Sequence, residues 1–237
     1  MKRLSPFNKK GITLIELLVA LVVSAITIAG MYRLFISQGK AYTVQDQVVE
    51  VQQNIRMAME VLSRDLRMTG FDDDKTDNST YPDGTANPKI VTVPTAIVTP
   101  VQDSDITINY EYFDRNVNPG QRRHTVRFWR EGSELKRTLA VDGGAPGPEE
   151  IILENVNELI FTYGVDANND GIMDDQNGNG LIDDNDWLTG AGVGTAKVIA
   201  VRAMLTARSD QTHPDAAKMV SPRTLVSAVT LRNLCLR

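Results

Sequence analysis

The sequence predicts an α+β protein in which one long N-terminal helix packs on a mostly antiparallel β-sheet domain. Three observations predict this fold. Residues 12–31 form an apolar run with a single charge, Glu16. Apolar residues then recur every three or four positions as far as Leu66, which is typical of an amphipathic helix. Further along, segments such as "ITINYEYF" and "TVRFWR" alternate apolar and polar residues, which is typical of antiparallel strands with one covered face.

The chain length and the net charge exclude some classes of function. A chain of 237 residues can hold one sizeable domain and an appendage. Its net charge of −5 and pI near 5.1 argue against a duplex nucleic-acid partner, which would require a basic face. The single cysteine, Cys235, cannot pair within the chain and does not report on the redox compartment. Clustered acidic residues suggest a cation as the ligand instead.

The first eleven residues form a basic leader ahead of a predicted membrane segment. Lys2, Arg3, Lys9 and Lys10 precede the apolar run 12–31, whose 20 residues suffice to cross a hydrocarbon core of about 30 Å. The positive charges place the N-terminus in the cytoplasm and the remainder across the membrane. A secretory signal would have a shorter run ending at a small-residue cleavage site, whereas the break here comes before the run, at Gly11.

Glu16 requires a partner, because a carboxylate in hydrocarbon costs about 2.5–3.5 kcal/mol at the bilayer centre. A cut between Gly11 and Ile12 would place a new amino group four residues before Glu16. The acid would then lie in the first helical turn, where the helix dipole favours it. The amine of a neighbouring subunit could also pair with it. The alternative is a plain single-span anchor that carries a glutamate.

Residues 32–70 are expected to continue the same helix outside the membrane. No proline occurs between Ile12 and Gly70, and Gly70 is placed to end the helix in a left-handed conformation. A coiled coil is the alternative, because the apolar spacing also fits a period of 3.5. The apolar stripe comprises Val44, Val48, Val51, Ile55, Ala58, Leu62 and Leu66.

Residues 71–237 are expected to form the globular, β-rich domain. Residues 72–88 are polar and rich in turn formers, and so predict an exposed connection. "REGSEL" predicts a hairpin turn, and "VDGGAPGPEE" a loop. The expected strands are 89–98, interrupted by Pro94, followed by 106–113, 125–130, 135–141, 159–165, 197–207 and 224–232.

An acidic loop at residues 166–186 contains seven aspartates and no cation. Two overlapping frames have the spacing of a calcium-binding EF-hand loop, with oxygen ligands at alternate positions around a glycine. The first frame comprises Asp166, Asn168, Asp170, Ile172 through its carbonyl, Asp174 and Asn177. The second comprises Asp175, Asn177, Asn179, Leu181 through its carbonyl, Asp183 and Asp186.

Calcium suits these residues because a hard cation takes six to eight oxygen ligands, whereas zinc would require sulfur or imidazole. Neither frame ends in the bidentate glutamate of an EF-hand, and Asn177 falls in both frames. The sequence therefore allows one or two calcium ions. The alternative is a solvated turn without metal.

We expect no enzymatic activity and assign no catalytic residue. The two histidines, His124 and His213, stand near no nucleophile motif, and neither a phosphate-binding glycine loop nor a paired-cysteine metal site is present. Trp129 and Trp187 are interpreted as packing residues.

Several segments of the chain resemble known pilins. "KKGITLIELLVAL" resembles the class III leader and mature N-terminus of type IV prepilins and type II secretion pseudopilins. "QNIRMAMEVLSRDLRMTGF", "ILENVNELIFTYGVDANNDG", "AKVIAVRAMLTARS" and "TLVSAVTLRN" resemble PilW-type minor pilins. The resemblance implies a pilin-like fold, cleavage after Gly11, N-methylation of Ile12, and a role for Glu16 in setting the register between subunits.

The resemblance implies a minor pilin of the type IV pilus or its tip complex, made as a prepilin in the bacterial inner membrane with its globular domain in the periplasm. The implied partners are prepilin peptidase, other minor pilins, the major pilin, the pilus assembly platform and a tip adhesin. A J-type pseudopilin of type II secretion is the nearest alternative. A membrane-anchored, calcium-dependent adhesion module that never enters a filament is another.

Overall fold

The computed structural model describes residues 11–71, 103–113, 121–141, 144–194, 196–209 and 220–235. The chain divides into two compact units, Met1–Asp46 and Gln47–Arg237. Helix α1 (Leu14–Met68) contributes to both. The leader before Gly11, the connection 72–88, the expected strand 89–98 and His213 lie outside the described residues.

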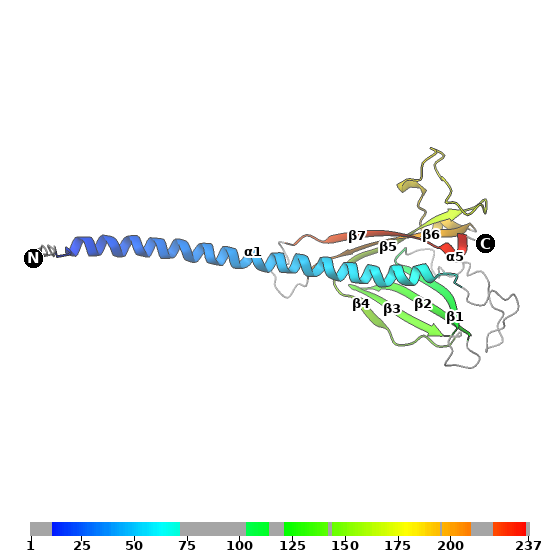
Figure 1. Cartoon of the computed structure of the whole chain (residues 1–237), viewed down its shortest axis with the longest axis horizontal. Coiled ribbons are helices and arrows are strands. Elements are labelled where there is room, and N and C mark those ends of the chain that lie inside the picture. The colour runs from blue at the N-terminus through cyan, green and yellow to red at the C-terminus, as the bar shows by residue number, and fades with distance from the viewer. Residues whose placement is uncertain are drawn as a thin grey trace, which may run out of the picture. The chain divides into compact units, whose positions relative to one another are not determined.

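Helix α1 has the bounds that the sequence predicts to within two residues at each end (Figure 1). Beyond Met68, Gly70 adopts a φ of 71°, the left-handed conformation expected where the helix stops. The Asn233 side-chain amide donates hydrogen bonds to the carbonyls of Arg67 (3.2 Å) and Thr69 (3.1 Å). These bonds satisfy carbonyls that the end of a helix leaves without an intrahelical partner.

The described strands of the second unit form two antiparallel sheets rather than the single sheet that the sequence suggested (Figure 1). The first sheet has the order β1-β2-β3-β4 and the second β5-β6-β7. The first comprises β1 (Asp105–Phe113), β2 (Gln121–Glu131), β3 (Glu134–Val141) and β4 (Glu150–Leu153). The second comprises β5 (Val156–Asp166), β6 (Lys197–Ala207) and β7 (Arg223–Thr230).

The two sheets separate between β4 and β5. Only Glu154 and Asn155 join these strands, and Asn155 has a positive φ of 58° that redirects the chain. Asparagine tolerates this conformation better than most residues. Strand β4 is an addition to the predicted set, and its four residues are too few to show a clear alternation.

Two further boundaries can be compared with the sequence predictions. The predicted hairpin is confirmed, because Gly132 and Ser133 alone connect β2 to β3 and Gly132 has a φ of 59°. The last predicted strand, 224–232, extends too far, because β7 ends at Thr230 and the short helix α5 (Arg232–Cys235) follows.

The outer half of α1 shares one buried core with both sheets. Ile55, Leu62 and Leu66 are almost fully buried, as are Phe128 in the first sheet and Phe161 in the second. The coiled-coil alternative is therefore unnecessary, since the apolar stripe of α1 within this unit belongs to a core that contains sheet residues. This is the α+β architecture that the sequence predicts.

An ion pair also joins α1 to the first sheet. Arg137 on β3 donates from Nε to the Asp65 carboxylate at 2.9 Å, and from Nη1 to Glu150 at 3.0 Å. Burial alone would lower the pKa of Arg137, but its hydrogen bonds and attraction to Asp65 and Glu150 raise the pKa above its ordinary value. Asp65 and Arg137 thus form a largely buried ion pair between α1 and β3.

Candidate functional site

The first candidate site is the start of α1, where Thr13 and Glu16 form a reciprocal cap. The Glu16 backbone N–H donates to Thr13 Oγ1 at 3.3 Å, while Thr13 donates to Glu16 Oε2 from its backbone N–H at 3.1 Å and from its hydroxyl at 3.2 Å. This is a capping box, which satisfies two of the amides that the first turn of a helix leaves open. This cap was not predicted, although the pattern Thr-x-x-Glu is visible at residues 13–16.

The cap uses only part of the carboxylate of Glu16. Both donors from Thr13 reach Oε2, and no residue in the described part of the chain donates a hydrogen bond to Oε1. An ionised carboxylate can accept about four hydrogen bonds. Glu16 can therefore hold the helix start in place and still bind a further donor.

An exposed apolar surface surrounds Glu16. Within the first unit the aliphatic side chains of α1 between Leu14 and Ile36 are exposed, and the helix is long and apolar enough to cross a membrane. Length and composition alone support this statement. The segment 12–31, which was predicted to span the membrane, lies in this part of the chain. From Leu14 onward it is one continuous helix.

The second candidate site is the acidic loop at the end of β5. In its first frame, the Asp166 carboxylate accepts hydrogen bonds from the backbone N–H groups of Asp170 (3.1 Å) and Gly171 (2.9 Å). The Asn168 side-chain oxygen accepts from Asp170 N–H, and Asp170 accepts from Ile172 N–H. Gly171 has a φ of 81°, a conformation available to glycine at little cost.

The second frame repeats this arrangement nine residues later. The Asp175 carboxylate accepts from the N–H groups of Gly178 (2.7 Å) and Gly180 (2.5 Å), and Gly180 has a φ of 82°. Asn177 accepts from Asn179 N–H, and Asn179 accepts from Leu181 N–H. The two frames identified from spacing therefore correspond to two turns of similar hydrogen bonding.

Asn177 belongs to the second turn in this conformation. Its side-chain oxygen accepts from Asn179, and its amide donates to Asp183 at 3.3 Å. The end of the second frame, Asp186, is fully buried and accepts backbone hydrogen bonds from Gln176 (2.8 Å) and Asp183 (2.6 Å). Asp174, late in the first frame, accepts from Ala167 N–H at 2.6 Å.

Backbone donors also determine the electrostatics of the loop. The N–H of Gly180, with further donors around it, lowers the pKa of Asp175 below its ordinary value. The N–H of Asn185 and the side-chain amide of Asn179 do the same for the pKa of Asp183. Both carboxylates are therefore held in the ionised form that binds a cation.

In this conformation the carboxylates accept hydrogen bonds rather than converge on one point. Among the residues that the structure describes, no three His, Cys, Asp or Glu side chains come close enough together to hold a metal ion. The oxygen-rich composition still fits calcium, which also accepts amide and backbone oxygens as ligands. A bound ion would have to replace donors such as the Asn177 and Asn179 amides at Asp183.

The far end of the loop is fixed to the second sheet. Arg202 on β6 donates to Asp184 at 2.6 Å and to the Thr162 hydroxyl at 3.0 Å, and its guanidinium lies 4.9 Å from the centre of the Trp187 ring. Leu188 exchanges two backbone hydrogen bonds with Tyr163 on β5. The loop is therefore attached at both ends to strands with a buried core.

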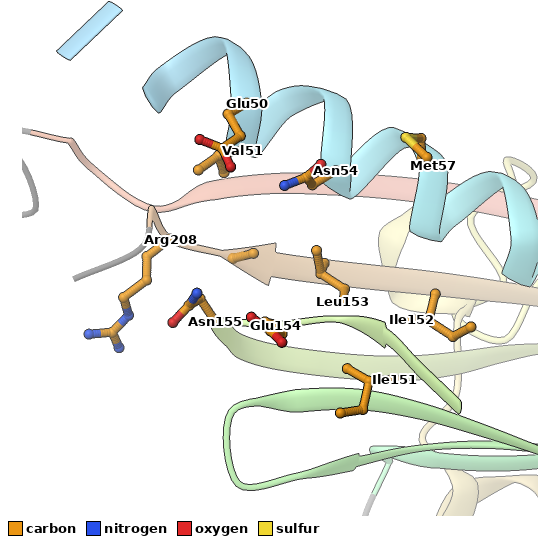
Figure 2. A pocket seen from close by; sticks show the side chains of 11 residues that line it. Glu50, Val51, Asn54, Met57, Ile151, Ile152, Leu153, Glu154, Asn155 and Arg208 are labelled. Atoms are coloured by element: carbon orange, nitrogen blue, oxygen red, sulfur yellow. The ribbon is translucent and has the colours of Figure 1, made fainter. Parts of the chain in front are cut away.

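Two surface grooves flank the outer half of α1. The first has a volume of about 370 Å³ and lies between α1 and the β4–β5 connection. Figure 2 shows Glu50, Asn54 and Met57 of α1 on one side of it and Ile151 and Ile152 of β4 on the other. The second groove, of about 550 Å³, lies between α1 and β7.

Of the two histidines, only His124 lies among the described residues; the two tryptophans interpreted as packing residues are described as well. His124 on β2 is buried and stacks on the Tyr110 ring at 5.2 Å. Trp129 lies under the Arg127 guanidinium, as Trp187 lies under that of Arg202.

Comparison with known proteins identifies the N-terminal segment. The family model of the prokaryotic N-terminal methylation motif matches residues 6–32. The methylation motif expected from the sequence is thereby confirmed, and it contains Gly11, Ile12 and Glu16. No curated protein matches the chain.

Solved structures of a pilin and of pseudopilins are similar at low sequence identity. A type IV-like pilin from Thermus thermophilus has 11% identity and a TM-score of 0.46, covering 78% of this chain and 96% of that one. A binary complex of two pseudopilins from the type 2 secretion system of Vibrio vulnificus has 12% identity and a TM-score of 0.39, with coverage of 77% and 93%. The GspK–GspI–GspJ complex of enterotoxigenic Escherichia coli has 14% identity and a TM-score of 0.39, with coverage of 76% and 97%.

Proposed function

We propose that this chain is a minor pilin of the PilW type that takes part in assembly of a type IV pilus. It enters the bacterial inner membrane as a prepilin with a cytoplasmic N-terminus and a periplasmic globular domain. Prepilin peptidase cleaves after Gly11, and Ile12 becomes the N-methylated first residue. The observation that carries this proposal is the methylation motif at residues 6–32, which leads into an apolar helix of membrane-spanning length.

Glu16 would act in assembly through its remaining acceptor atom. After cleavage, Thr13 is the second residue of the mature chain, so the capping box does not depend on the leader. Oε2 continues to receive the donors of Thr13, while Oε1 is available to the new amino group of a neighbouring subunit. An ion pair in hydrocarbon is strong because little water screens it, and it offsets the cost of burying either charge alone.

The partners of this proposal are other minor pilins, the major pilin, the assembly platform and a tip adhesin. The apolar surface of α1 around Glu16 would join the helical core of the filament, where each helix covers its neighbours. The globular unit, with its own buried core, would remain outside that core and contact adjacent subunits through its loops.

A charge-removing substitution tests the proposal. Glu16→Gln keeps the size of the side chain and can still cap Thr13, but it cannot neutralise an amine, so we expect a large loss of this subunit from sheared pili. Glu50→Gln, on the exposed face of the outer half of α1, is the matched control and should incorporate normally. Normal incorporation of the Glu16→Gln chain would contradict the proposed mechanism.

Deletion of the gene separates the proposed function from its nearest alternative. A minor pilin is required for surface pili, whereas a J-type pseudopilin is required for export of a secreted enzyme. We expect the deletion strain to lose pili and to keep secretion. Loss of secretion with normal pili would assign the chain to the secretion system instead.

We further propose that the acidic loop binds one or two calcium ions. Its support is the pair of similar turns starting at Asp166 and Asp175, each rich in side-chain oxygens around a glycine of positive φ. Calcium would neutralise part of the charge of seven aspartates and hold the loop rigid. If added calcium changes neither the stability nor the order of the loop, the alternative of a solvated turn without metal holds instead.

A further inference from the structure

The groove between α1 and β7 combines an apolar floor with a basic rim. Its apolar lining includes Val61, Leu225 and Val226, and Val226 is 52% exposed. Arg56, Arg64 and Arg67 also line it, against a single acid, Glu60. Within the described residues Arg56 and Arg67 form no ion pair, and Arg64 reaches only Asp65, at 3.6 Å. The groove therefore offers unneutralised positive charge next to exposed aliphatic surface.

The same chain presents a surface of complementary character. The acidic loop exposes three large aliphatic side chains, Ile172 (67%), Leu181 (69%) and Ile182 (50%), and five of its seven aspartates are at least partly exposed. Ile172 and Leu181 occupy equivalent positions of the two similar turns. We call these three residues the apolar tip. Large aliphatic groups exposed on one loop are unfavourable in water and mark a candidate contact surface.

We propose that the groove between α1 and β7 binds the apolar tip of a second copy of this chain. Aliphatic side chains of the tip would cover Val61 and Val226, while the accessible aspartates of the same loop would face Arg56, Arg64 and Arg67. The charge complementarity favours this occupant over a neutral or basic surface. The proposal rests on the proposed function, since it gives a pilin subunit a way to contact the next one.

The proposed contact is heterologous, because the tip and the groove are different surfaces of one chain. Such a contact leaves an unused tip on one copy and an unused groove on the other, so it can repeat along an open chain instead of closing a symmetric dimer. The contact should weaken with added salt, because its charges lie at the surface.

Disulfide cross-linking between two single-cysteine variants tests the contact. The full-length chain, in detergent and carrying Cys235→Ser, is prepared as Leu181→Cys and as Val226→Cys with different affinity tags. We expect cross-linked dimers to be at least ten times more abundant in the mixture than in either variant alone. Equal cross-linking in the single-variant samples, or none in the mixture, would overturn the proposal.

Charge reversal gives a second, independent measurement. Arg64→Glu with Arg67→Glu in the Val226→Cys chain should reduce the cross-linked yield several-fold. Arg33→Glu with Lys40→Glu, two charges on the same helix outside the groove, should leave the yield unchanged. An equal effect of both pairs would contradict the assigned groove, and melting curves establish that each variant is folded.

Cross-linking in pili distinguishes failure of this contact from failure of the proposed function. A chain found in sheared pili without the tip-to-groove cross-link would overturn the contact and retain the pilin function. Trapping of Val226→Cys on a different subunit would also overturn the second copy as the occupant. Absence of the chain from pili would overturn the proposed function itself.

Discussion

The ion pair between Asp65 and Arg137 gives a quantitative test of how α1 is attached to the first sheet. The Asp65 side chain is 5% exposed and that of Arg137 is 13% exposed, with 2.9 Å between Nε and Oδ2. Removing one partner of a buried pair costs about 3–5 kcal/mol, because the other charge stays buried without compensation. We therefore expect Asp65→Ala to lower the free energy of unfolding by an amount in this range.

The ion-pair partners that remain after each substitution determine where in this range the loss in free energy of unfolding should fall. After Asp65→Ala, Arg137 keeps Glu150, whose side chain is 56% exposed and contributes about 0–1 kcal/mol. We therefore expect a loss near the lower limit, about 3 kcal/mol. After Arg137→Ala, Asp65 keeps only Arg64, at 3.6 Å and with a side chain that is 70% exposed, so a slightly larger loss is expected. Replacing both partners with Asp65→Leu and Arg137→Met should recover most of the stability.

Urea unfolding of the soluble part of the chain, from Tyr42 onward, measures these differences. Glu60→Ala, an exposed change on the same helix with no ion pair among the described residues, is the control and should cost less than about 0.5 kcal/mol. A loss below about 1 kcal/mol for Asp65→Ala would refute the reasoning that this pair is buried and structurally required. A double variant less stable than either single variant would refute it as well.

Three further results are expected. Calcium should raise the melting temperature of the soluble part, and an unchanged melting curve with calcium or chelator would contradict the proposed metal site. The hydrogen bonds to Asp175 and Asp183 depress their pKa values below the ordinary 3.8. Their contribution to loop stability is therefore complete above pH 3.8 and is lost as the pH falls through the lower pKa values of the folded state. Faster amide exchange at Gly178 and Gly180 at low pH, corrected for intrinsic rates, would show this loss, and unchanged protection would contradict it. Asn233→Ala should destabilise the domain by about 0.5–1.5 kcal/mol because it removes the donors at the end of α1; an unchanged urea midpoint would show that water replaces them.

Periodicity predicted the outer half of α1 and strand β1 because each has one mainly buried face, whereas β6 is buried on both faces over residues 198–201. The stripe from Val51 to Leu66 faces the core, and alternation in residues 106–113 matches β1. The division into two sheets could not be predicted in this way. It depends on the two-residue connection at Glu154 and Asn155 and on a strand of four residues, both of which are set by packing rather than by pattern.

The sequence predicted more of the acidic loop than of the start of α1. Spacing alone identified both turns of the acidic loop, because side-chain oxygens and glycines recur at fixed positions. It could not assign Asn177, which fits both frames, and the structure places its hydrogen bonds in the second. The unusual acid Glu16 was evident from the sequence, but its local partner Thr13 was not predicted, because an acid within an apolar run points first to a distant positive charge. The hydrogen bond from Thr13 N–H to the Glu16 carboxylate explains in part why an acid is found at this position.

The mature N-terminus is the most direct measure of the account as a whole. Mass spectrometry of the chain purified from cells that contain prepilin peptidase should find Ile12 as the first residue, carrying one N-methyl group. A chain that still begins at Met1 would contradict the pilin function and would favour a membrane-anchored adhesion module.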